Sequence, residues 1–75
     1  MEKLVNVETG LTVKVEELLS SGYIRERMLA LGLTKGASIA VVRRGPKKNL
    51  TVYNIRGTMI ALRKEEGEKI IVSYI

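Results

Sequence analysis

The stretch MLALGLTKG, residues 28–36, decides the fold. An apolar segment meets one glycine at Gly32, resumes with the apolar Leu33, and meets a second glycine at Gly36 before a strand-like segment begins. Glycine readily takes the left-handed conformation that ends a helix, and the apolar residue after it folds back onto the last helical turn. The stretch therefore predicts a helix that ends at Gly32 and a turn at Gly36 that starts a strand.

The residues before Gly32 have the period of a short helix. Ile24, Met28 and Leu31 are spaced to share one face and are expected to face the core, while charged residues fill the opposite face. Ser20 and Ser21 are candidate N-caps. These features predict one helix near residues 21–31.

The rest of the chain has the pattern of short strands joined by turns. In the first of them Leu11, Val13 and Val15 alternate with polar residues and are expected to share one face. Gly45-Pro46 and Arg56-Gly57 mark tight turns. The predicted strands are residues 11–18, 37–44, 50–55, 58–63 and 69–75.

Two segments between or before the strands have no clear pattern. Residues 3–10 are too short for assignment, and the polar residues 64–69 are compatible with a single helical turn. Short strands with hairpin connections favour a mainly β fold, a small antiparallel barrel of five to six strands that closes on itself and hides its edges. We expect residues 1–75 to form a single domain.

Composition excludes several classes of function. The chain has 75 residues, no cysteine and no histidine, and all eight of its acidic residues are glutamates. Nucleophile–base pairs and thiolate or imidazole metal sites therefore cannot be built. The cluster of Glu65, Glu66 and Glu68 is interleaved with lysines and is typical of a solvated turn. We predict a protein that is not an enzyme, with no catalytic residues, no cofactor and no metal site.

The formal net charge of +5 permits an acidic partner. The segment RRGPKK, residues 43–48, places four cations on a predicted hairpin tip. The nearby strands offer only Tyr53 for stacking on bases, so a partner-facing or solvated turn is favoured over nucleic-acid binding.

No apolar run approaches the ~18–20 residues needed to span a bilayer, and the N-terminus lacks the apolar region of a signal peptide. We expect a cytoplasmic protein that does not insert into the membrane. A core this small is also compatible with a homo-oligomer.

The order of these motifs resembles the FeoA family. The resemblance rests on RERMLALGL at residues 25–33 with Gly36, then Gly45-Pro46, residues 57–63 and residues 69–72. It implies an SH3-like barrel that takes part in bacterial or archaeal ferrous iron uptake, with a FeoB-type membrane transporter carrying a GTP-binding domain as partner. The family often has alanine in place of Gly67, so glycine is expected to loosen the turn before the last strand.

The resemblance and the exposed charges together suggest which residues act. Alternative hypotheses are a nucleic-acid-binding barrel that uses the basic hairpin and a metal-responsive module like the C-terminal domains of metal-dependent repressors. The structural motif is Gly32, Leu33, Gly36, Gly45, Pro46, Gly57 and Arg63. The predicted partner-binding residues are Arg25, Arg27, Leu29, Arg43, Arg44, Lys47 and Lys48.

Overall fold

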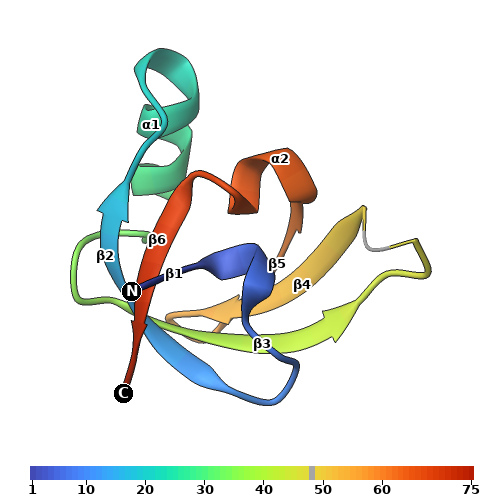
Figure 1. Ribbon diagram of the computed structural model, residues 1–75. Coiled ribbons are helices and arrows are strands. Elements are labelled where there is room, and N and C mark those ends of the chain that lie inside the picture. Colours follow the sequence, from blue (N-terminus) through green and yellow to red (C-terminus); the bar gives the residue numbers. More distant parts are fainter. Residues whose placement is uncertain (48) are drawn as a thin grey trace.

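Six antiparallel strands form one sheet in the order β1-β6-β2-β3-β4-β5 (Figure 1). The computed structural model describes residues 1–47 and 49–75. Its strands are β1 (Glu2–Lys3), β2 (Thr12–Leu18), β3 (Ser38–Arg44), β4 (Leu50–Ile55), β5 (Thr58–Arg63) and β6 (Ile70–Tyr74). Its helices are the 3₁₀ turn η1 (Leu4–Asn6), α1 (Gly22–Ala30) and α2 (Lys64–Gly67). The mainly β fold with one short helix between the first two long strands agrees with the sequence prediction.

Helix α1 ends as the sequence predicts. Gly32 has a φ of +98°, its N–H donates to the Leu29 carbonyl at 3.0 Å, and the Leu33 N–H donates to the Met28 carbonyl at 3.1 Å. These two hydrogen bonds define a Schellman motif, in which the residue after the glycine packs back onto the helix. Leu33 and Met28 are accordingly both buried. The motif turns the chain from α1 toward β3.

The core lies inside the curled sheet. Two register shifts, between Val15 and Glu17 in β2 and between Val41 and Arg43 in β3, bend the sheet because each bulge increases its local twist. One part of the predicted alternation is wrong: Leu11 precedes β2 and is exposed, while Val13 and Val15 are buried. The largest fully buried side chains are Tyr53, Leu4, Met28, Leu33, Ile39, Ile55, Leu62 and Ile70.

The barrel is closed by packing and not by a continuous hydrogen-bonded ladder. Within the described residues the sheet has β1 at one edge and β5 at the other, and α2 packs against η1 between them (Figure 1). Gly67 is buried there, and a β-carbon added to it would lie 2.6 Å from Val5 Cγ1. The prediction that glycine merely loosens this turn is therefore incomplete, because the space of a side chain is already filled by Val5.

Candidate interaction surface

Helix α1 projects from one end of the barrel (Figure 1). Some of its apolar side chains are exposed to solvent. Tyr23, at the start of the helix, is 78% exposed. Ile24, which the helical spacing assigns to the core, is 40% exposed, so this part of the prediction is wrong. We call the following residues the helix-side surface: Leu19, Tyr23, Ile24, Leu50 and Ala61.

Two adjoining hollows lie on this surface. One, of about 350 Å³, lies between the start of α1 and α2, and the other, of about 300 Å³, lies between α1 and strands β4 and β5. Ile24 and Glu66 line both of them. The two hollows therefore form one concave region in which exposed apolar side chains surround a charged pair.

The charged centre is an ion pair between Arg27 of α1 and Glu66 of α2. The Glu66 carboxylate also accepts the backbone N–H of Arg63 at 2.9 Å. Burial raises the pKa of Glu66, but the Arg63 hydrogen bond and the Arg27 guanidinium outweigh it and leave the pKa below its ordinary value. Glu66 thus stays ionised and fastens α1 to α2.

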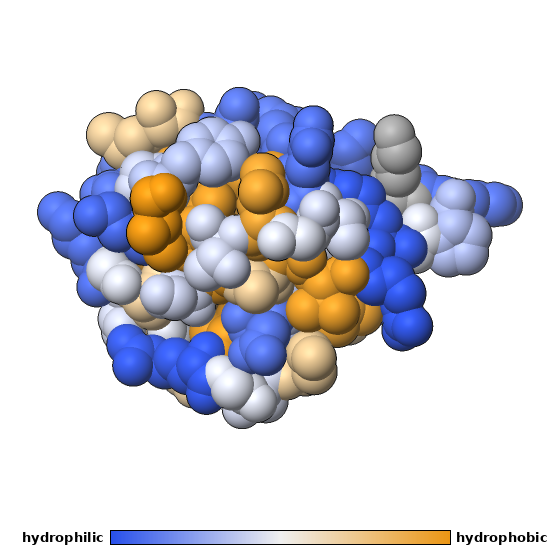
Figure 2. Space-filling view, turned by 90° about the horizontal axis from the view of Figure 1, so that it is seen from below, coloured by the Kyte–Doolittle hydropathy of each residue, from blue (hydrophilic) through white to orange (hydrophobic). Residues whose placement is uncertain are grey.

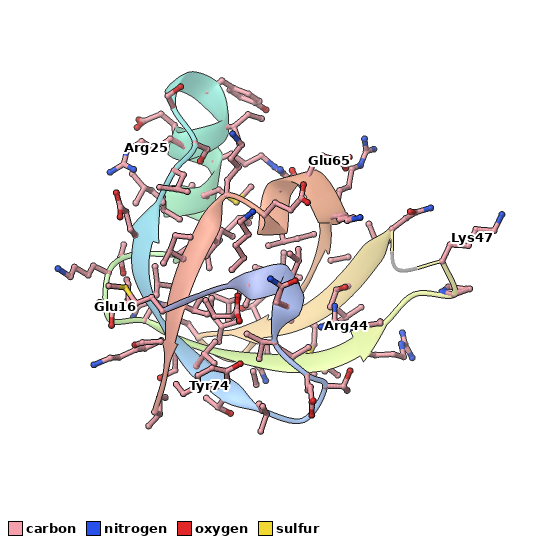
Figure 3. The ribbon with its side chains drawn as sticks, viewed as in Figure 1. Glu16, Arg25, Arg44, Lys47, Glu65 and Tyr74 are labelled. Atoms are coloured by element: carbon pink, nitrogen blue, oxygen red, sulfur yellow. The ribbon has the colours of Figure 1, made fainter. Side chains whose placement is uncertain are left out.

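The structure gives the three predicted helix residues different surroundings. Arg27 is occupied by the ion pair, and Leu29 is half-buried beside Val15. Arg25 is exposed and donates from Nη1 to the Leu18 carbonyl at 3.3 Å; Figure 3 shows it pointing away from the barrel. Arg25 is therefore the most accessible of the three.

The cations of the basic hairpin, residues 43–48, also differ in their surroundings. Arg43 and Lys47 are exposed, and Lys48 lies outside the described residues. Arg44 is half-buried, and its guanidinium donates to the Val7 carbonyl and, at 3.4 Å, to the Thr51 hydroxyl. In Figure 3 Lys47 extends from the tip, whereas Arg44 lies beside η1 at the hairpin's base.

Glycines close the turns around these elements. The Gly45 N–H donates to the Leu50 carbonyl at 2.7 Å, which closes the β3–β4 hairpin before the exposed Pro46. Gly36 has a φ of +87° and donates its N–H to the Val15 carbonyl at 2.7 Å, so it joins the turn after α1 to β2. Gly57 has the same φ in the two-residue turn between β4 and β5.

Arg56 is a residue that sequence reasoning missed. It has a left-handed φ of 52°, donates from Nε to the Gly32 carbonyl at 3.2 Å, and donates from Nη2 to the Thr34 hydroxyl at 2.8 Å. It therefore ties the β4–β5 turn to the end of α1. The Arg56-Gly57 pair signalled the turn, but this contact joins residues 24 apart and has no local signature.

The opposite end of the barrel carries scattered apolar groups. Figure 2, seen from below, shows hydrophobic side chains interrupted by hydrophilic ones. Across the described residues there is no group of three or more acidic, histidine or cysteine side chains that could hold a metal ion. In the same part of the chain, no helix is both long and apolar enough to cross a membrane.

The sequence matches a known protein family and one curated relative. The family model described as "FeoA domain" matches residues 2–74. The chain is 30% identical over 73 residues to an Fe(2+) transport protein A/Fe(2+) transporter FeoB fusion protein of Porphyromonas gingivalis. That match covers 97% of this chain but only 9% of the fusion protein.

Solved structures agree with the family model. The solution structure of the FeoA protein from Chlorobium tepidum has a TM-score of 0.93 at 28% identity, covering 99% of this chain and 70% of that one. A Stenotrophomonas maltophilia FeoA complexed with zinc, described as a prokaryotic SH3 domain protein, has a TM-score of 0.85 at 23% identity, covering 97% and 91%.

A manganese-dependent transcriptional repressor shares the fold alone, with a TM-score of 0.89 at 15% identity over 99% of this chain and 41% of the repressor. The SH3-like barrel is thus common to FeoA proteins and to part of such a repressor. The family model covers nearly the whole sequence, whereas the repressor shares few of its residues. The chain belongs to the FeoA domain family.

Proposed function

We propose that this chain is a cytoplasmic, non-enzymatic accessory protein of ferrous iron uptake that binds the cytoplasmic part of a FeoB-type transporter, including its GTP-binding region. The observation that carries the proposal is the fusion relative, which joins a FeoA part and a FeoB part in one polypeptide. Two parts fixed in one chain meet at a high effective concentration, so fusion favours partners that act together.

The helix-side surface is the proposed contact. Exposed aromatic and aliphatic side chains are what a protein partner can desolvate and anchor on. Tyr23 offers a large amphipathic side chain, and the hollows beside Ile24 could receive apolar side chains of the partner. In this proposal Arg25 lies at the rim and contributes mainly to the rate of association.

The mechanism needs no chemistry on this chain. A small barrel that prefers one nucleotide state of the transporter shifts the balance between its states by the difference in binding free energy. Such a role requires that the affinity for the GTP-bound and GDP-bound transporter differ.

The test is a binding titration of this chain against the cytoplasmic region of the cognate transporter, in the nucleotide-free, GDP and GTP-analogue states. Tyr23→Glu should weaken binding at least roughly tenfold, because it places a charge in the apolar contact. Tyr23 is a sharper site than Arg27, since replacing Arg27 would also break its ion pair with Glu66.

The matched control is Lys47→Glu, which changes an exposed residue on the hairpin tip. It should leave the affinity within about twofold if the helix-side surface makes the contact. A greater loss from Lys47→Glu than from Tyr23→Glu would move the contact to the basic hairpin. No association in any nucleotide state would refute the proposed partner.

A further inference from the structure

A further hollow, of about 480 Å³, lies on another side of α2 and has a different chemistry. It is bounded by η1, by the base of the β3–β4 hairpin and by α2. These three segments are far apart in the sequence and meet where the barrel closes (Figure 1). The polar side chains that line it are Lys3, Asn6, Arg44, Thr51, Lys64 and Glu68.

The side chains that line the hollow carry a net positive charge, while the Glu2 carboxylate next to it accepts the Asn6 side-chain N–H at 3.1 Å. The cations Lys3, Arg44 and Lys64 face one carboxylate, Glu68, which leaves a formal charge of +2. Among the described residues the one ion pair within 4 Å is Arg27–Glu66, outside this hollow. Like charges around one concavity repel each other and attract an anion, which raises the local concentration of anions.

Arg44 is held in place for such an anion. Its guanidinium donates to the Val7 carbonyl and to the hydroxyl of the buried Thr51, so the half-buried side chain is fixed by the fold. Guanidinium has further N–H donors, and its planar fork matches the oxygens of a phosphate or carboxylate. A fixed arginine together with two exposed lysines resembles the donor sets that bind phosphate groups.

We propose that this hollow binds the phosphate groups of a small polyphosphate, either free or carried by a nucleotide. The +2 charge suits a group with several negative oxygens better than a single carboxylate. The volume lies in the range of small-molecule sites, roughly 300–1,000 Å³, so a diphosphate fits with room for a further group. The inference does not depend on the proposed transporter partner.

The test is an NMR titration of the ¹⁵N-labelled chain with inorganic pyrophosphate at about 0.15 M salt and pH 7, where charges outside the hollow are largely screened. Saturable shifts of the backbone amides of Lys3, Asn6 and Lys64 are expected. Lys3→Gln and Lys64→Gln should each raise the Kd roughly tenfold, since each removes one charged donor. Both side chains are exposed, so these variants should keep the parent's dispersed spectrum.

A parallel titration with ADP shows whether the hollow prefers a free polyphosphate or the phosphates of a nucleotide. Binding of ADP at the same amides, with a lower Kd than pyrophosphate, identifies a nucleotide as the ligand class. A lower Kd for pyrophosphate than for ADP identifies the free polyphosphate as the ligand class. Either result supports the site.

The matched controls are Arg43→Gln and Lys47→Gln, which remove the same charge from exposed positions of the hairpin outside the hollow. They should change the Kd less than about twofold. Equal weakening by the controls would reduce the effect to general attraction by a basic surface and overturn the proposal. Shifts that fail to saturate, or that centre on the hairpin, would overturn it as well.

Discussion

Replacing Gly67 by alanine is the most direct test of how the barrel closes. The added β-carbon would lie 2.6 Å from Val5 Cγ1, about 1 Å inside ordinary carbon–carbon contact. Val5 is β-branched and belongs to η1, so relief requires η1 and α2 to move apart. Such overpacking costs about 1–3 kcal/mol, which exceeds the gain of at most about 1 kcal/mol from alanine's higher helix propensity.

The expected net loss is therefore about 1 kcal/mol, with an upper end of about 2 kcal/mol. For a domain of this size each kcal/mol corresponds to a fall in Tm of roughly 4–8 °C. Thermal and urea unfolding followed by circular dichroism measure both quantities. The result matters because helix propensity alone predicts the opposite sign.

The double variant Val5→Ala/Gly67→Ala isolates the contact. Val5→Ala alone should cost about 1 kcal/mol in lost burial, and it also opens the space that the alanine at position 67 needs. The double variant should therefore be more stable than the sum of the two single losses predicts, by about 1 kcal/mol or more. A stabilised Gly67→Ala protein, or strictly additive losses, would refute closure through Val5 and Gly67.

Three further predictions concern charge and backbone conformation. Glu66→Gln should lower the free energy of unfolding at pH 7. Because folding lowers the pKa of Glu66 from its usual 4.5, the stabilisation is present above that value and is lost as the pH falls through the lowered pKa, so the difference between parent and variant should be smaller in melts at about pH 3 than at pH 7. A gap of equal size at both pH values would contradict this assignment. Gly32→Ala should cost about 1–2 kcal/mol in urea unfolding, and more than Gly36→Ala, because both have a left-handed φ but only at position 32 does a β-carbon meet the Arg56 side chain, at 3.0 Å. Equal losses would show that the Arg56 contact is immaterial. Random-sequence single-stranded DNA should not bind in mobility-shift assays at about 50 mM salt, and a saturable, steeply salt-dependent complex would revive the nucleic-acid alternative.

Most of the fold could be predicted from patterns among residues that are close together in the sequence. The strand limits at residues 50–55 and 58–63 follow from alternation between turn residues, and the structure has the same limits. The end of α1 followed from Gly32 and Leu33, because the Schellman motif needs only a left-handed residue and an apolar successor. These features depend only on residues that are close together in the sequence, so one sequence is enough to predict them.

The misassigned residues depend on what lies across the fold. Helical spacing placed Ile24 in the core, but α1 projects past the end of the barrel, and its first turn has little to pack against. The short segment of β1 and η1 acquires its structure from contacts with β6 and α2, which lie far from it in the sequence.

The same limit applies to the candidate site. The sequence grouped Arg43 and Arg44 as equivalent cations, yet adjacent strand residues point to opposite faces, and a register shift lies beside them. Arg27 was grouped with Arg25 for the same reason, although its carboxylate partner lies 39 residues away. Charge runs thus indicate that cations are present, while topology decides which of them are free.

The two fastenings of α1 have a consequence for recognition. Because Glu66 holds the middle of the helix and Arg56 holds the carbonyl at its end, the side chains of its first turn stand on a scaffold that is ordered before any encounter. Little backbone entropy is then lost on docking, and the free energy of contact is available for affinity. Loss of the Arg56 tether, far from Tyr23, should therefore appear as a larger entropic penalty of complex formation with no contact removed.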